Sequence, residues 1–330
     1  MNRLVLFTAA AALAAPLAPP SPVLAQAANN FDMKEWPIER GGRSRDPYVA
    51  PDGKVFFAGQ QGNYVGRLDP ASGEVRYYEL EESTNPHTVI VDDQGIVWYA
   101  GNRNGRIGRL NPVNGELKTF PTGEARDPHT MHFDGKGNIW FSSQGASRIG
   151  RLNMATGKVD IINPLGEQRA NPYGLDLDKD GRLFVSLFAT NNIAMVTPDM
   201  QFKIFPTAEG GRVRRNAVTA DGMVWYVDYA RGYVGRLDPN TGQTKEWMSP
   251  GGAQSRPYAI TADGDGRLWV SETGAEKKLV GFDPKTEKFF ANFPVSHNIR
   301  HMMFDPKTNT MWFGTDSNTI GRVVTRQIVQ

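Results

Sequence analysis

Three of the five histidines in this sequence fall at corresponding points of a repeated pattern. His87 and His129 each follow a proline, and His301 follows Arg300 at the matching point of a later repeat. Imidazole can act as an acid, a base or a ligand near neutral pH. Because chance placement would scatter these residues, we predict that the three histidines line one site and carry out acid–base chemistry.

A tripeptide of the form Val/Ile-Gly-Arg indicates which elements position these histidines. Its centres are Gly66, Gly108, Gly150, Gly235 and Gly321, with weaker copies at Ala194 and Gly281, so successive centres are 42, 42, 44, 41, 46 and 40 residues apart. A second, aromatic run such as Val97-Trp98-Tyr99 also occurs seven times. Repeats of this length that carry four short strands are typical of a β-propeller. We therefore predict seven blades.

The sequence also predicts how the ring closes. Residues 34–38 resemble the outer strands of the repeats, such as residues 118–121, yet they precede the first repeat. The last repeat has no fourth strand of its own. We expect the N-terminal strand to complete the last blade, which would leave no unpaired edge. The predicted fold is all-β: a seven-bladed β-propeller of four-stranded antiparallel blades, with the last blade closed by the N-terminal strand.

Polar and aromatic residues recur where the first strand of each repeat begins and where the second strand ends. These two points are neighbours in an antiparallel pair, so we expect both sets to surround the central channel on one face. A concave rim of convergent polar groups is typical of a binding site, although water in the channel would also favour polar residues. The residues that we predict to hold a substrate there are Tyr173, Asn216, Tyr258 and Arg300.

Composition excludes several classes of protein. The net charge is +2, and the arginines recur about once per repeat instead of forming the basic stripe of a nucleic-acid-binding protein. The chain has no cysteine, which excludes disulfides, thiol nucleophiles and thiolate metal sites. We expect a small-molecule substrate, no nucleic-acid partner and a monomer.

The first 25 residues have the features of a signal peptide. Arg3 precedes the apolar residues 4–17, and Ala25 ends a small-residue cleavage site. The apolar run is short and is interrupted by Pro16, so we expect no membrane span. The sequence predicts a periplasmic or secreted protein in which residues 26–330 form one propeller domain.

The repeated motifs resemble those of the virginiamycin B lyase (streptogramin B lyase) family. They combine a Pro-His or Pro-Tyr start, as at Pro128-His129, with an Asp-x-x-Gly turn, a Trp-Phe strand and an Ile-Gly-Arg-Leu strand. The resemblance covers all seven repeats. It implies a seven-bladed propeller, and the characterised lyase linearises a cyclic depsipeptide by elimination across its ester C–O bond, assisted by magnesium.

The resemblance also implies two placements of the catalytic residues. In the family these residues lie in the last two blades, as a Pro-His, a Glu-Pro-His and a later Glu. In chain order they fall on Tyr258, on Ile299-Arg300-His301 and on Asp316, which makes His301 the base and Asp316 a possible metal ligand. One family ligand is replaced by Ile299, and Arg300 adds a positive charge.

The second placement uses blades two and three, which read Asn85-Pro86-His87, Asp127-Pro128-His129 and then Gln144. Asp127 and Gln144 would offer oxygen ligands to Mg²⁺, with Ca²⁺ not excluded. His129 would remove a proton and His87 would orient the substrate.

We therefore predict an exported enzyme that acts on a small cyclic ester or lactone by metal-assisted C–O elimination or ring opening. The alternative from another class is a non-catalytic periplasmic ligand-binding or scaffold propeller, because one fold hosts many functions. A third possibility is a gluconolactonase-like hydrolase, which requires a Glu/Asn/Asp metal cage that we do not find in the sequence.

Overall fold

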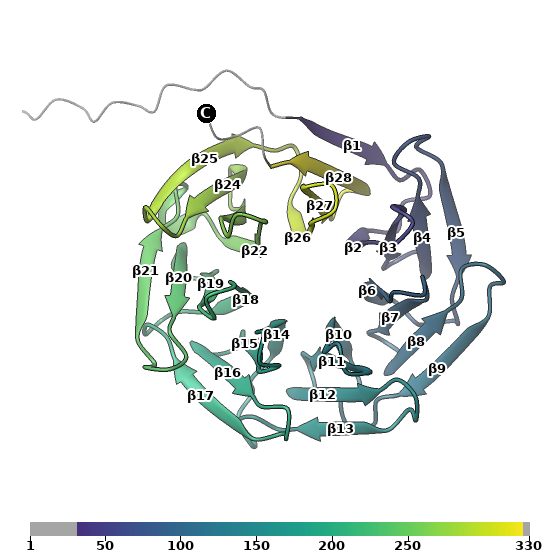
Figure 1. The fold of residues 1–330 in the computed structure, drawn as a ribbon, viewed down its shortest axis with the longest axis horizontal. Coiled ribbons are helices and arrows are strands. Elements are labelled where there is room, and N and C mark those ends of the chain that lie inside the picture. The colour runs from purple at the N-terminus through teal and green to yellow at the C-terminus, as the bar shows by residue number, and fades with distance from the viewer. Residues whose placement is uncertain (1–31, 326–330) are drawn as a thin grey trace, which may run out of the picture.

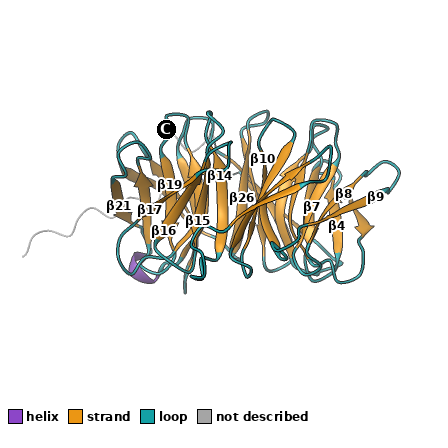
Figure 2. Ribbon diagram, turned by 90° about the horizontal axis from the view of Figure 1, so that it is seen from below, coloured by secondary structure: helices purple, strands orange, loops and turns teal. Residues whose placement is uncertain are grey.

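A computed structural model describes residues 32–325 and shows seven four-stranded antiparallel sheets around a central channel (Figure 1). The predicted signal peptide, residues 1–25, lies outside the described residues. The strands run between the two faces of the disc, so the connecting loops gather on these faces (Figure 2). No helix among residues 32–325 is long and apolar enough to cross a membrane.

Six blades consist of consecutive strands, of which the first in each blade lies at the channel. In chain order they are β2 (Ser44–Val49), β3 (Val55–Gly59), β4 (Tyr64–Leu68) and β5 (Val75–Glu79); β6 (Pro86–Val91), β7 (Val97–Gly101), β8 (Arg106–Leu110) and β9 (Leu117–Pro121); β10 (Pro128–Phe133), β11 (Asn138–Ser143), β12 (Arg148–Asn153) and β13 (Val159–Ile162); β14 (Pro172–Leu177), β15 (Leu183–Leu187), β16 (Asn192–Val196) and β17 (Phe202–Pro206); β18 (Val213–Val218), β19 (Val224–Asp228), β20 (Tyr233–Leu237) and β21 (Thr244–Met248); and β22 (Pro257–Ala262), β23 (Leu268–Thr273), β24 (Lys277–Asp283) and β25 (Lys288–Pro294). A short 3₁₀ helix, η1 (Gly252–Gln254), precedes β22.

The last blade joins both ends of the described chain. It consists of β26 (Ile299–Asp305), β27 (Thr310–Thr315) and β28 (Thr319–Val324), with β1 (Met33–Pro37) as its outer strand. Strand β1 pairs with β28 in antiparallel register, so that Trp36 lies opposite Ile320. Trp36 is buried and stacks on Trp312, with 5.4 Å between ring centroids. The predicted closure is confirmed.

The glycine of the repeated Val/Ile-Gly-Arg tripeptide is required by close packing within a blade. A Cβ atom at Gly150 would lie 2.1 Å from Cζ of Phe141 on the neighbouring strand, and Gly66 and Phe57 have the same relation. The arginine that follows connects neighbouring blades in at least one case. An Nη1 atom of Arg151 donates to the carbonyl oxygen of Pro198 at 2.6 Å. The tripeptide is therefore a packing motif.

A β-bulge in each innermost strand decides which residues face the channel. In β10, Pro128 pairs with Ser143 and Met131 pairs with Phe141, so three steps along β10 match two along β11. The same extra residue occurs in the other six innermost strands. Bulges of this kind redirect side chains next to functional sites.

Candidate functional site

The bulges place two rings of side chains across the channel. What we call the first ring contains, from the seven blades in order, Arg45, His87, His129, Tyr173, Arg214, Tyr258 and Arg300. The second ring contains the next residue of each strand: Asp46, Thr88, Thr130, Gly174, Arg215, Ala259 and His301.

This register corrects the prediction that three histidines share one repeat position. His87 and His129 are equivalent, but His301 lies one residue further along its strand, and Arg300 occupies the matching position. The motif that marks the strand start is missing here, because Ile299 replaces the proline that precedes His87 and His129. For the same reason the first ring in blades one and five is formed by arginines that the sequence analysis did not select.

The first ring closes the channel by direct contacts. The rings of His87 and His129 lie 3.5 Å apart between centroids, and Tyr173 follows at 4.3 Å from His129. Nη2 of Arg45 is 3.3 Å from Nε2 of His87. Both histidines are only 3% exposed. Neighbouring ring members therefore cover both histidines, so neither lies on the open polar rim that the sequence analysis predicts.

Aromatic residues surround Arg214 on the first ring. Its guanidinium carbon lies 3.9 to 4.7 Å from the ring centroids of Tyr258, Phe188, Tyr173 and Tyr229. Its Nη2 donates to the hydroxyl oxygens of Tyr258 at 2.9 Å and of Tyr173 at 3.2 Å. The two tyrosine hydroxyls are also hydrogen-bonded to each other. The predicted convergence of Tyr173 and Tyr258 is thus present, with a cation between them.

These neighbours change the ionisation of the first ring. Burial opposes ionisation of Tyr258, but the charges of Arg214, Arg45 and Arg215 outweigh it and lower its pKa to about 7. Burial, followed by the neighbouring Tyr258, raises the pKa of Tyr173, so the Tyr173 hydroxyl stays protonated. Burial, followed by nearby positive charge, lowers the pKa of His87 and His129 well below the ordinary value. Both imidazoles are neutral at neutral pH.

The second ring contains a buried carboxylate. Asp46 is fully buried and has a positive φ of 33°, a strained value for a residue other than glycine. One of its oxygens, Oδ2, accepts from Thr88 Oγ1 at 2.7 Å and from Arg215 Nη2 at 3.4 Å. Burial opposes its ionisation, but the charges of His301 in its protonated form, of Arg215 and of other neighbours hold its pKa well below the ordinary range.

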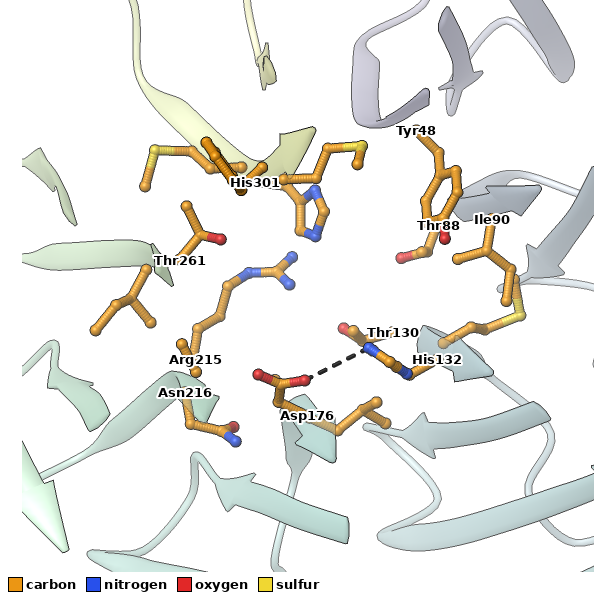
Figure 3. A pocket seen from close by; sticks show the side chains of 18 of the residues that line it. Tyr48, Thr88, Ile90, Thr130, His132, Asp176, Arg215, Asn216, Thr261 and His301 are labelled. Carbon is orange, nitrogen blue, oxygen red and sulfur yellow. Dashed lines mark ion pairs between the residues drawn. The ribbon is translucent and has the colours of Figure 1, made fainter. Parts of the chain in front are cut away.

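A cavity of about 430 Å³ lies beyond the second ring, towards the end of the channel where the innermost strands finish. Arg215, His301, Thr88 and Thr130 face it, and the guanidinium and imidazole groups point towards its middle (Figure 3). Its remaining wall is largely apolar and includes Ile90, Met131, Leu175, Ile260 and Met302.

His301 is the one predicted catalytic histidine that lines this cavity. Burial lowers its pKa to about 4 although Asp46 lies nearby, so its imidazole is neutral at neutral pH. Its Nδ1 is buried and has no hydrogen-bond partner among the described residues. A neutral imidazole with a free nitrogen can accept a proton or donate one hydrogen bond.

The other predicted substrate residues have different surroundings. Asn216 lines the cavity, but its amide group accepts from Ser186 Oγ at 2.8 Å and donates to the Phe184 carbonyl at 3.0 Å. Arg300 lies on the first ring and forms an ion pair with Asp316 at 2.5 Å. The sequence analysis did not select Asp46, Arg214 or Arg215, because their positions follow from the bulge.

The residues predicted to bind a metal ion do not fit that role. Asp127 accepts hydrogen bonds from Ser143 Oγ and from the backbone N–H groups of Gly145 and Ala146, which hold the loop after β11. Asp316, in another blade, is neutralised by Arg300. Gln144 alone offers a neutral oxygen. In residues 32–325, no three His, Asp or Glu side chains come together as a metal site.

A β-propeller with a mostly apolar channel cavity and a few convergent polar groups has the features of a small-molecule-binding protein. The chain belongs to the virginiamycin B lyase family, whose model matches residues 30–163 and 162–330. It is 36% identical over 91 residues to a virginiamycin B lyase from Nocardia farcinica. That match spans 27% of this chain and 31% of the relative, so it covers less than a third of the relative's length.

Solved structures share the fold. A streptogramin B lyase has a TM-score of 0.80 at 22% identity, covering 89% of this chain and 97% of the other. A catalytically inactive virginiamycin B lyase from Staphylococcus aureus with quinupristin has a TM-score of 0.81 at 22% identity, covering 89% and 99%. The extracellular domain of a hybrid two-component system from B. thetaiotaomicron has a TM-score of 0.69 at 17% identity, covering 88% and 42%.

Proposed function

We propose that this protein is an exported carbon–oxygen lyase that opens a small cyclic ester in the channel cavity. The observation that supports this proposal is that His301, a neutral imidazole, and Arg215, a buried cation, face the same cavity. Membership of the virginiamycin B lyase family favours elimination over other chemistry.

The proposed reaction needs only groups that line the cavity. His301 removes a proton from the carbon next to a carbonyl group, the electrons of that C–H bond form a C=C bond, and the ester C–O bond breaks. The oxygen leaves as a carboxylate with the bonding electrons. Arg215 stabilises the negative charge that develops, as a fixed positive group in a water-poor site does efficiently. The proton on His301 is then released to solvent.

This proposal differs from the sequence-based expectation of a magnesium-assisted reaction. Asp127 and Asp316, which belong to the two alternative placements, already bond to protein groups, so neither offers a free carboxylate to a metal ion. Arg215 therefore takes the charge-stabilising role in the proposal. His129 and His87 contribute to closing the channel and do not contact the cavity substrate.

The test uses quinupristin and a set of small lactones with the purified protein. Elimination gives a ring-opened product of unchanged mass with new alkene absorbance, whereas a gluconolactonase-like hydrolysis adds one water. We expect the elimination product, and we expect His301→Gln to lower kcat by about 100-fold or more. His297→Gln, in a loop outside the cavity, is the matched control. Failure of all these esters to react would contradict the proposal.

A second candidate function is ligand binding without turnover. The near-complete burial of His87 and His129 favours it, since two of the three predicted catalytic groups are inaccessible. The fold is also found in the extracellular domain of a two-component system, so it is not confined to lyases. Saturable binding of an ester with unchanged mass and absorbance would support this alternative.

A further inference from the structure

The charges on the two rings do not balance. Among the described residues of these rings there are four arginines, namely Arg45, Arg214, Arg215 and Arg300, and one carboxylate, Asp46. Arg300 is neutralised by Asp316 outside the rings. Three guanidinium groups therefore stand against one carboxylate of the rings, Asp46, while the neighbouring histidines are neutral. Buried charge is costly unless it is paired, so further negative charge is required.

Part of that negative charge is available on the first ring. The Tyr258 oxygen accepts from Arg214 and is hydrogen-bonded to the Tyr173 hydroxyl. Its ionised form compensates chiefly Arg214 and Arg45, and then Arg215. Arg215 gains less, because its Nη2 contact with Asp46 is long, at 3.4 Å, and its charge acts on Tyr258 less than the charges of Arg214 and Arg45 do. The uncompensated positive charge therefore lies at the floor of the cavity.

The acidic group on the cavity wall does not fill this role. Asp176 accepts from the backbone N–H groups of Val218 and Leu177, at 2.8 and 2.9 Å. Its other contact is with His132 Nε2 at 3.4 Å, shown as the dashed line in Figure 3. These bonds hold the carboxylate at the wall, and within residues 32–325 it forms no ion pair with Arg215, whose one carboxylate partner is Asp46.

We propose that the cavity binds a small organic carboxylate, with Arg215 and His301 at the carboxylate and the apolar wall around its body. Arg215 supplies the charge and hydrogen-bond donors, and the neutral His301 supplies one N–H. The wall residues Ile90, Met131 and Ile260 favour an apolar body. This deepens the proposed function and rests on it for the reaction: the carboxylate held by Arg215 and His301 would be the one that cleavage of the ester releases.

The experiment compares hydrocinnamate with hydrocinnamamide, which has nearly the same shape and no charge, by isothermal titration calorimetry. We expect wild type to bind the carboxylate at least about tenfold more tightly, the value of one good charge-assisted hydrogen bond. Arg215→Met is expected to abolish the preference, and Arg215→Lys to retain part of it. Arg103→Met, at an exposed loop, removes the same net charge as a control.

A further variant locates the binding. Thr261 lines the cavity, so Thr261→Trp should fill it and weaken both compounds. Equal affinity of wild type for the two compounds would overturn the proposal. So would a preference that survives in folded Arg215→Met, or binding that is unchanged in Thr261→Trp. Hydrocinnamate and hydrocinnamamide contain no ester, so their binding is measured without turnover. If no ester reacts but the carboxylate still binds more tightly, only the proposed lyase activity is refuted. If an ester reacts but the carboxylate is not preferred, only this inference is refuted.

Discussion

Single residues in the channel have properties that their neighbours determine. Tyr258 is the clearest example, since three arginine charges outweigh burial and bring its pKa to about 7. By contrast, burial raises the pKa of Tyr99, which has no cationic neighbour of this kind, to well above its ordinary value. The same residue type therefore has opposite ionisation behaviour in two buried places.

This difference predicts a pH dependence of stability. The folded-state pKa of Tyr258 is lowered from 10.0 to about 7, so between these values the unfolded chain binds more protons than the folded chain. The contribution of the phenolate to the free energy of unfolding therefore grows as pH rises above 7 and is lost as pH falls through 7. We expect the wild type to gain stability over Tyr258→Phe between pH 7 and 10, measured by urea unfolding.

The control for this prediction is Tyr233→Phe, at a strand outside the channel. Its difference from wild type is measured over the same pH range. If the difference in unfolding free energy between wild type and Tyr258→Phe is constant from pH 7 to 10, the Tyr258 hydroxyl stays protonated. The channel would then carry more positive charge than we infer.

At the scale of elements, the sequence predicts the number of blades, which depends on periodic motifs. It does not predict which residues of the innermost strands face the channel, because a β-bulge shifts them. Five copies of the Gly-Arg tripeptide, two weaker copies and seven aromatic strands were enough for the number of blades, because the five glycines repeat one packing contact. The bulge adds one residue without changing the apolar pattern. Blades one, five and seven lack the proline that marks the strand start, so Arg45 and Arg214 were missed and His301 was placed one residue out of register.

The repeated packing contact can be tested at Gly150. Gly150→Ala places a methyl group 2.1 Å from Cζ of Phe141 in the present geometry, so the strands or the ring must move. Such overpacking costs about 1–3 kcal/mol or more of unfolding free energy. Phe141→Leu shortens the opposing side chain, and the double variant should recover part of the loss. If the changes in unfolding free energy of the two single variants simply add up in the double variant, the two residues are not in direct contact.

At the scale of the whole molecule, stability depends on joining the two ends of the ring. Strand β1 is the outer strand of the last blade although it comes first in the sequence, and it covers the edge of β28. Trp36 of this strand is buried, and so is Ile38, the first residue after the strand. Every blade but this one can form from consecutive residues, so the last blade forms only when the chain has closed.

Deletion of residues 32–38 tests this closure. The loss should amount to roughly 3–6 kcal/mol from exposing two large apolar side-chain sites, in addition to the unpaired edge of β28. We expect Tm to fall by many degrees and the protein to self-associate through the open edge, as measured by calorimetry and size-exclusion chromatography.

Trp36→Ala should reproduce part of the fall in Tm without the self-association, because it leaves the edge paired. Lys34→Ala, at an exposed position of the same strand, should change little. A deletion that unfolds at the wild-type temperature would mean that the other six blades hold the ring without a closed seventh.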